Sequence, residues 1–375
     1  MDRREAVLKY INMDQKGLEI GPWFNPLVPK RDGYQSVVLD VFDTETLRER
    51  ARNTPSIHPS LHERIEEVDV VGSSTHIDEL IAARGELGTY DYIVSSHNFE
   101  HLPNPIRFLQ GCAKVLKPGG MISMAIPDRR ACFDYFRPVT TLSAWIEPYL
   151  KDVSVPSRGQ YFDMVTCTAL YDLGTEKTIS FHRNVDPAKV SLALRLDESL
   201  AEWTDPSRDG QYHDSHCSVF TPTVFEMLIR DIGYLGLAPF EVVEVFDSPG
   251  VEFYAHLRFN EDKSALRPAD YEATRNRLMH RILEEAAETS DVAQSVRVAH
   301  DKIAELNQQL EAMSGLREHA AALERLQEER RAEVERLAAR GRALEDHLNA
   351  IRASTSWRMT LPIRKLVSLV RGKSA

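Results

Sequence analysis

The chain has 375 residues, 42% of them hydrophobic, and a formal net charge of −11 at pH 7. Its length suits one large domain or two ordinary ones, and its composition is that of a soluble protein. The acidic balance argues against nucleic acid as a partner. Four scattered cysteines form no C-x-x-C pair, which suits a reducing compartment. With a charged N-terminus and no long apolar run, the sequence predicts a cytoplasmic protein without a signal peptide or a membrane-spanning helix.

Strand and helix patterns alternate over the first 130 residues. Short apolar runs predict strands, and amphipathic or charged stretches between them predict helices. This alternation is typical of βαβ units and a parallel sheet. Strands are expected at 16–20, 36–40, 68–71, 92–95 and 121–126, and helices at 4–16, 44–52, 78–84 and 105–116.

The pattern breaks from about residue 138 to 217, where no period is clear. We expect an irregular insertion there that covers the sheet edge. Periodicity returns with a helix that begins after Thr221, followed by strands at 240–246 and 251–259. The turn between these strands predicts a hairpin that closes an otherwise parallel sheet. The whole domain is expected to span residues 1–260.

The remaining residues are helical in character. We expect a helical linker over 261–295 and a coiled coil over 296–352, because ten of fourteen a and d positions from Leu306 onward are apolar. The coiled coil would make the chain a homo-oligomer; the alternative is one long helix folded back on the domain. The tail, 353–375, is basic and amphipathic. It is expected to contact the inner face of the plasma membrane, or else to be a frayed terminus.

The ends of the first two strands point to a nucleoside ligand. In an open α/β sheet, ligands bind outside the carboxyl ends of the strands, where Glu19, Gly21 and Asp40 would lie. A carboxylate such as Asp40 can accept hydrogen bonds from both ribose hydroxyls, and Gly21 lets a ligand approach the backbone. The G-x-G-x-x-G fingerprint is missing, because bulky residues occupy 23–26. This argues against NAD or FAD and favours S-adenosylmethionine, which has adenosine but no phosphates.

Several segments at these strand ends resemble class I S-adenosylmethionine-dependent methyltransferases. They are Glu19–Pro22, Asp40, Tyr90–Leu102 and Val115–Gly120. Residues 96–101 spell an S-H-x-x-E-H signature and residues 127–130 a P-D-x-R signature, as in a bacterial group of these enzymes. The resemblance implies a Rossmann-like sheet of seven strands with the last one antiparallel, and S-adenosyl-L-methionine as cofactor.

The resemblance also implies roles for single residues in cofactor binding. Glu19 and Gly21 match the first cofactor motif, and Asp40 matches the acid that binds the ribose. Ser74 matches the adenine side, while Ser95 and Ser96 match the segment beside the methionine part of the cofactor.

Methyl transfer to an oxygen acceptor requires a base, because the acceptor hydroxyl loses its proton. His97 and His101 follow the fourth strand directly and are the candidates, with Glu100 able to orient either imidazole. The alternative for His101 is a capping or packing role.

Three further residues are candidates for acceptor binding. Arg130 could clamp an anionic group of the acceptor; the alternative is a structural ion pair with Asp128 or Asp134. His213 and His216 are expected to line the acceptor pocket; the alternative is that they simply pack. His213-x-x-His216 has the residue types of metal ligands, but no third ligand follows at a fixed spacing, so no metal is predicted.

These features together predict methyl transfer to a small-molecule or glycan acceptor, with a role in cell-surface polysaccharide biosynthesis suggested by the tail. The alternative is a catalytically weak or inactive methyltransferase fold that acts as a coiled-coil scaffold in polysaccharide assembly. A nicotinamide oxidoreductase is disfavoured by the missing glycines.

Overall fold

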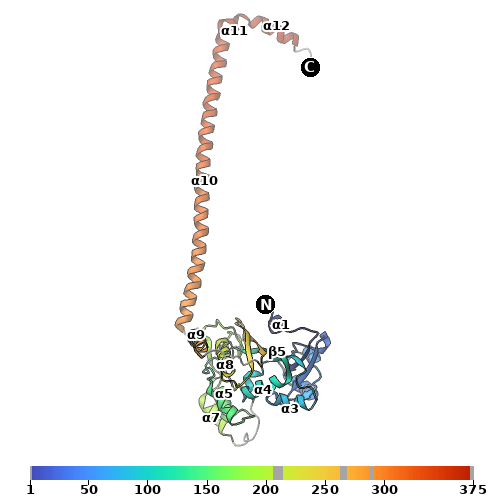
Figure 1. Cartoon of the computed structure of the whole chain (residues 1–375). Helices are drawn as coiled ribbons and strands as arrows, with labels where there is room; N and C mark the ends of the chain where they lie inside the picture. Colours follow the sequence, from blue (N-terminus) through green and yellow to red (C-terminus); the bar gives the residue numbers. More distant parts are fainter. Residues whose placement is uncertain (1, 206–213, 262–267, 288–290, 372–375) are drawn as a thin grey trace. The chain divides into compact units, whose positions relative to one another are not determined.

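The computed structural model describes residues 2–205, 214–261, 268–287 and 291–371. The chain divides into two compact units, residues 1–295 and 296–375. Figure 1 shows the elements of both units along the chain.

A seven-stranded sheet forms the centre of the first unit. Five strands run parallel, β10 is antiparallel to β5, and β9 is antiparallel to β10. The predicted seven-stranded sheet with its closing hairpin is therefore confirmed. In spatial order the strands are β3 (Val70–Val71), β2 (Gln35–Asp40), β1 (Lys16–Ile20), β4 (Tyr90–Ser96), β5 (Leu116–Pro127), β10 (Glu252–Phe259) and β9 (Phe240–Phe246).

Both faces of the sheet are covered, which explains why its central strands are apolar on both sides. On β4, Ile93 belongs to the larger core cluster, while Tyr92 and Val94 belong to a second cluster on the opposite face. The helices of this unit include α1 (Arg3–Val7), α2 (Thr44–Arg52), α3 (Ile77–Ala82), α4 (Pro105–Val115) and α8 (Pro222–Tyr234).

Helix α1 is shorter than the predicted helix over 4–16. Side chains take over backbone hydrogen bonds after it ends: Asn12 Oδ1 accepts from the N–H of Asp14, and Gln15 Oε1 accepts from the N–H of Asn12. Such local bonds compete with helix formation. Helix α8, in contrast, begins as predicted, with Thr221 as its N-cap.

An aromatic cluster anchors the segment that follows β4. Phe99 is buried, and its ring meets the rings of Phe108, Trp145, Phe220 and Phe225 at centroid distances of 5.4–6.0 Å. Each such pair contributes on the order of 1 kcal/mol beyond its buried area. The short helix η4 (Phe99–His101) is therefore fixed by its first residue.

The insertion is more regular than the sequence indicates. It contains a small antiparallel sheet, and the core beside this sheet includes Phe181 together with Tyr135, which precedes the insertion. Its strands have only two to four residues, too few to show a period. The elements are α5 (Ser143–Leu150), α6 (Arg158–Cys167), β6 (Ala169–Asp172), β7 (Lys177–Thr178), β8 (Val190–Leu192) and α7 (Leu196–Thr204).

Helix α9 (Pro268–Ala287) packs against α8 instead of forming a free linker. Tyr271 and Leu278 are buried, and the Tyr271 ring stacks on Tyr234 at 4.1 Å. The buried carboxylate of Glu285 accepts hydrogen bonds from the hydroxyls of Thr221 and Thr223. This helix is thus part of the first unit.

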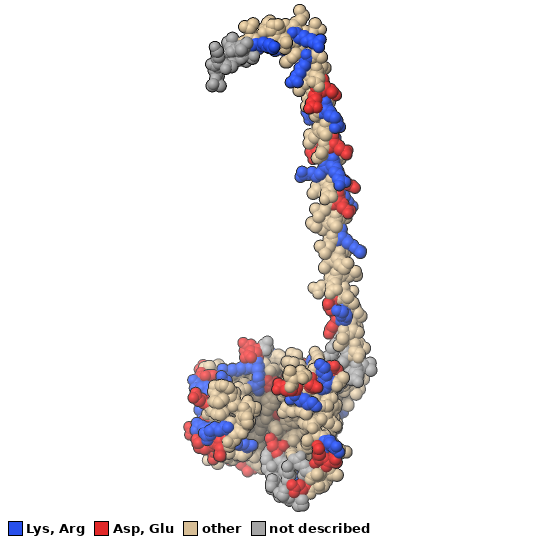
Figure 2. All heavy atoms as spheres, turned by 180° about the vertical axis from the view of Figure 1, so that it is seen from behind, with Lys and Arg blue, Asp and Glu red and all other residues tan. Residues whose placement is uncertain are grey.

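The second unit consists of helices. Helix α10 (Asp291–Ala353) has 63 residues and is followed by α11 (Thr355–Met359) and α12 (Leu361–Arg371). Acidic and basic side chains both occur along α10, whereas basic ones dominate at α11 and α12 (Figure 2). No helix among the described residues is long and apolar enough to cross a bilayer. The apolar heptad side chains are exposed, among them Leu306, Met313, Leu316, Leu323, Val334, Leu337, Leu344, Leu348 and Ile351.

Candidate active site

Three strand ends lie in one row at the carboxyl edge of the sheet. Ile20 of β1 pairs with Leu39 of β2 and with Ser95 of β4. The next residues along these strands, Gly21, Asp40 and Ser96, therefore lie side by side. Strand order reverses between β1 and β4, so this row is at the topological switch point where open α/β sheets bind ligands. We call Gly21, Asp40 and Ser96 the cofactor row.

Gly21 leaves its backbone open to a ligand. Its φ is +59°, which favours glycine, and no atom lies within 4 Å of the position that a Cβ would take. The bulky side chains after it do not fill this space. Trp23 donates a hydrogen bond to the carbonyl of Leu47, and Trp23 and Phe24 pack on a cluster that includes Leu47 and Ala51 of α2.

Glu19 fixes the loop that follows Gly21. Its carboxylate accepts hydrogen bonds from the backbone N–H groups of Leu27 and Val28, at 2.6 and 3.2 Å. Burial raises the pKa of Glu19 to about 7. These contacts assign the side chain a positioning role; its predicted contact with the cofactor stays a prediction.

Asp40, the last residue of β2, is the member of the cofactor row on that strand. Its side chain is buried and accepts a hydrogen bond from the backbone N–H of Phe42. Burial raises the pKa of Asp40 above its ordinary value. A ribose hydroxyl that donates to this carboxylate would offset the cost of burying it.

The predicted residues Ser74 and Ser95 are joined by a residue that the sequence did not single out. Ser74 Oγ donates to Asn98 Oδ1 at 3.0 Å, and Asn98 Nδ2 donates to Ser95 Oγ at 3.2 Å. This chain connects the segments that follow β3 and β4. Asn98 lies within the S-H-x-x-E-H stretch, at one of its variable positions.

Arg3 and Glu252 were also missed. Arg3 donates to Ser96 Oγ at 2.7 Å and to Glu252 Oε1 at 2.6 Å, and Glu252 Oε2 lies 2.9 Å from His97 Nε2. Arg3 and Glu252 are 249 residues apart, so no local pattern could reveal this contact. His97 itself has a φ of +50°, which turns its side chain out of the strand direction.

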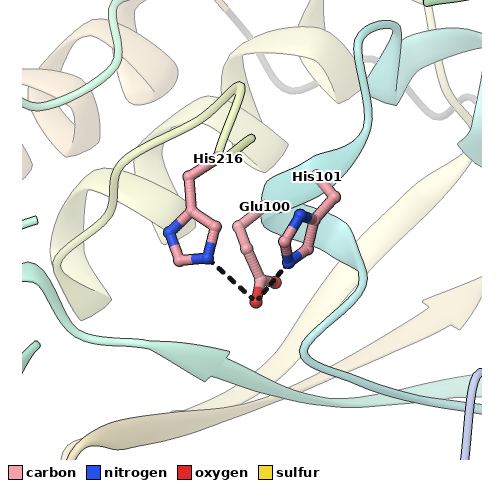
Figure 3. Close-up of side chains that lie close together, drawn as sticks. All are labelled: Glu100, His101 and His216. Atoms are coloured by element: carbon pink, nitrogen blue, oxygen red, sulfur yellow. Dashed lines mark ion pairs between the residues drawn. The ribbon is translucent and has the colours of Figure 1, made fainter. Parts of the chain in front are cut away.

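Glu100 lies at the centre of three histidines (Figure 3 shows two of them). Its side chain is 1% exposed, and its Oε1 lies 3.5 Å from His97 Nδ1, 3.7 Å from His101 Nε2 and 3.9 Å from His216 Nε2. His101 follows the Phe99 anchor, while His216 comes from the end of the insertion. The structure thus brings together two predicted catalytic residues and one predicted acceptor-binding residue.

Each imidazole has a carboxylate at its other ring nitrogen. His97 Nε2 lies 2.9 Å from Glu252 Oε2. His101 Nδ1 lies 2.9 Å from Asp214, and His216 Nδ1 lies 2.5 Å from Asp134. Asp134 also pairs with Arg137 at 2.7 Å.

The carboxylates raise the pKa values of His97 and His101. Burial lowers the pKa of His97, but Glu100 and Glu252 outweigh it and raise the pKa to about 10. Burial likewise lowers the pKa of His101, and Asp214 and Glu100 raise it above its ordinary value. For Glu100, burial raises the pKa, and the imidazoles bring it below its ordinary value.

Arg130 shows the structural ion pair that the sequence left open. It is buried, and its guanidinium donates to both carboxylate oxygens of Asp128, the shortest contact being 2.6 Å. The anion clamp predicted for Arg130 gains no support from these contacts, because the guanidinium is already occupied. His213 lies outside the described residues.

The row fits S-adenosylmethionine in its chemistry. Gly21 offers an accessible backbone, and Asp40 offers a buried acceptor at the next strand end. The comparisons with known proteins agree: a family model described as "Methyltransferase domain" matches residues 16–237, more than half of the chain. The chain belongs to this methyltransferase family. It is a class I S-adenosylmethionine-dependent methyltransferase, with S-adenosylmethionine as its cofactor.

Matches to individual proteins are partial. A ubiquinone biosynthesis O-methyltransferase of Vibrio cholerae is 35% identical over 57 residues, which are 15% of this chain and 23% of that protein. One of Parvibaculum lavamentivorans is 41% identical over 51 residues, 14% of this chain and 19% of that protein. The chain therefore matches about a fifth of the length of these relatives.

Solved structures with a similar fold share little sequence. A SAM-dependent methyltransferase from Aquifex aeolicus is 13% identical, with a TM-score of 0.34 over 68% of this chain and 89% of that one. The CcbJ methyltransferase from Streptomyces caelestis is 16% identical, with a TM-score of 0.35 over the same shares, 68% and 89%.

Proposed function

We propose that this enzyme methylates a hydroxyl oxygen of a small-molecule or glycan acceptor. The observation that carries the proposal is the group of histidines around Glu100, which begins with His97, directly after the cofactor row. An oxygen acceptor loses its proton during transfer, so it needs a proton-accepting group at this place. The relatives named O-methyltransferases support an oxygen acceptor.

Several residues of the chain have separate roles in methyl transfer. Asp40 holds the ribose, and the open backbone at Gly21 lets the cofactor lie against the sheet edge. S-adenosylmethionine, when bound, supplies the methyl group of its sulfonium. His97 or His101, in its neutral form, takes the proton of the acceptor hydroxyl; because the carboxylates raise the pKa values of both imidazoles, a higher pH favours this form. Because the reaction is an in-line displacement, positioning of the acceptor provides much of the rate.

The test uses S-adenosylmethionine with a labelled methyl group and the small-molecule fraction of a cell extract. We expect a labelled methylated product by mass spectrometry with the wild-type chain. Asp40→Ala should lose the product and bind S-adenosylmethionine at least tenfold more weakly by calorimetry. A wild-type chain that binds the cofactor but labels nothing across hydroxyl-bearing extracts would contradict the proposal.

A place near the membrane would suit an acceptor in cell-surface polysaccharide synthesis. The support is the tail, in which exposed apolar residues alternate with basic ones. Leu361, Ile363 and Leu366 are 47–65% exposed, and Arg364 lies over the Trp357 ring at 3.4 Å. Basic residues at the headgroups with apolar side chains below them are typical of helices that lie on an anionic bilayer.

A scaffold role is the second candidate, favoured by the exposed apolar stripe of α10. In that case the methyltransferase fold is retained without need for catalysis. Asp40→Ala in the cell discriminates the two candidates. The enzyme predicts that methylation is lost, whereas the scaffold predicts an unchanged phenotype. Deletion of residues 296–352 should change the phenotype if the chain is a scaffold and should leave methylation in place if it is an enzyme.

A further inference from the structure

We propose that Glu100, His101 and His216 bind a divalent transition-metal ion such as Zn²⁺. Their ligand atoms, one from each side chain, all lie within 4.8 Å of one another. Two imidazoles and one carboxylate form a ligand set found in mononuclear zinc and non-haem iron sites. Figure 3 shows both rings turned with Nε2 toward the carboxylate of Glu100. We call these three residues the metal cluster.

The distances in the metal cluster suit an ion better than direct contacts. The separations of 3.7 and 3.9 Å from Glu100 Oε1 to the two Nε2 atoms are too long for hydrogen bonds. Ligand atoms at about 2.0–2.1 Å from a tetrahedral ion would be roughly 3.3 Å apart. All three ligand atoms lie within 4.8 Å of one another, so an ion would draw them together by up to roughly 1.5 Å through rotation of the side chains.

The carboxylate of Glu100 is otherwise poorly satisfied. Both of its oxygens are buried, and among the described residues neither makes a hydrogen bond of acceptable geometry. Buried polar atoms in native proteins are nearly always hydrogen-bonded or bound to an ion, so this group calls for a ligand. A metal ion would supply the missing partner for Glu100.

The surroundings provide the outer partners that metal-binding histidines use. Histidine ligands commonly donate their other ring N–H to a carboxylate, which fixes the tautomer and orients the ring. Asp134 makes this hydrogen bond with His216, and a carboxylate oxygen of Asp214 lies 2.9 Å from Nδ1 of His101. Asp134 is itself buried and held by Arg137, so the His216 ring is fixed before an ion arrives.

Three protein ligands leave one coordination position for another molecule, as in catalytic sites. The metal cluster begins three residues after His97, whose neighbour Ser96 belongs to the cofactor row. We therefore assign the open position to the hydroxyl oxygen of the acceptor and leave His97 as the base, because His101 would use its Nε2 for the ion; this step rests on the proposed function. Metal binding itself does not depend on it.

The experiment measures binding of Zn²⁺ to the full chain, without cofactor or acceptor. After removal of metals with a chelator, we expect one equivalent of Zn²⁺ per chain by calorimetry and by elemental analysis after dialysis. Mg²⁺, which prefers oxygen ligands, should bind far more weakly. Co²⁺ in its place should give the absorption bands of a four- or five-coordinate site with nitrogen ligands.

Variants assign the ion to its ligands. Glu100→Gln and His216→Gln should each weaken Zn²⁺ binding at least 100-fold, and Asp134→Asn should weaken it 10–100-fold. His182→Gln changes an exposed histidine of the insertion and serves as the matched control. Retained S-adenosylmethionine binding reports that a variant is folded; should one ligand variant misfold, His101→Gln replaces it.

Two results would overturn the proposal: no stoichiometric Zn²⁺ on the wild-type chain, or Zn²⁺ binding that the ligand variants leave unchanged. In the first case the three side chains form an ion-pair network without a metal. Either result leaves the methyl-transfer test standing, because that test reports labelled product and cofactor binding.

Discussion

The Nδ1 atom of His216 lies 2.5 Å from a carboxylate oxygen of Asp134, although 82 residues separate the two in sequence. Arg137 strengthens this link: it donates to Asp134 at 2.7 Å and to the carbonyl oxygen of His216 at 3.0 Å. All three side chains are buried. The start and the end of the insertion are therefore joined through charged groups shielded from water.

Removal of the Asp134 carboxylate should destabilise the fold. Asp134→Ala leaves the buried Arg137 without its charge partner, and we expect a loss of about 3 kcal/mol in the free energy of unfolding. Urea unfolding in the presence of a chelator measures it. Asp197→Ala is the control, because its ion pair with Arg195 is exposed and should contribute little to stability. Equal losses in both variants would contradict the buried-pair argument.

Two glycines of the β1 region should respond differently to alanine. At Gly17 a Cβ would stand 1.9 Å from the ring of the buried Tyr92, so Gly17→Ala should cost about 3 kcal/mol of stability. At Gly21 space is open but φ is +59°, so Gly21→Ala should cost about 1–2 kcal/mol. Only Gly21→Ala should also weaken S-adenosylmethionine binding of the folded protein. Thermal unfolding and calorimetry separate the two effects.

Glu19 should make stability depend on pH. Its pKa is about 7 in the fold against an ordinary value of 4.5. Between these values the folded state holds the proton more tightly than the unfolded state, so stability falls as pH rises from 5 to 8. We expect Glu19→Gln to reduce this fall by on the order of 3 kcal/mol at most. Exposed Glu49→Gln should leave the slope unchanged, and an unchanged slope in Glu19→Gln would refute the assignment.

The apolar stripe of α10 should hold two or more chains together. A chain that ends at residue 290 is expected to show a smaller assembly by light scattering than the full chain. Leu316→Lys with Leu323→Lys should have the same effect, because charges would enter the seam. Glu328→Lys lies outside the a and d positions and is the control. A full chain of monomeric mass would remove the homo-oligomer proposal.

The tail should bind anionic vesicles. In flotation with vesicles that contain an anionic lipid, the full chain should rise with the lipid, and a chain that lacks residues 353–375 should not. Arg364→Glu with Lys365→Glu should weaken binding and remove its dependence on salt. Equal flotation with neutral vesicles would show that charge is not the cause.

Much of the sheet could be predicted because each strand carries its own local pattern. Strands β1, β2, β4 and β5 are apolar runs that end in turns, and the cofactor row lies at their ends by topology alone. The insertion could not be predicted in the same way, since its short strands depend on a core shared with Tyr135, outside the insertion.

The metal cluster could not be predicted from the sequence for a different reason. His216 and Glu100 meet only because the insertion returns to the end of β4, and no spacing in the sequence encodes that return. The sequence around His213 and His216 shows no third ligand, because Glu100 and His101, which lie beside His216 in the fold, come more than 110 residues earlier. Asp134 and Glu252 were missed for the same reason.

The link between Asp134 and His216 also bears on how acceptor preference could change. A segment whose two ends are tied to each other can be exchanged as a unit, provided that Trp145, which packs against Phe99 in the main core, is kept. Grafting the stretch between Asp134 and His216 from a relative would then redirect the enzyme to another acceptor, while the part of the molecule that binds the cofactor stays intact.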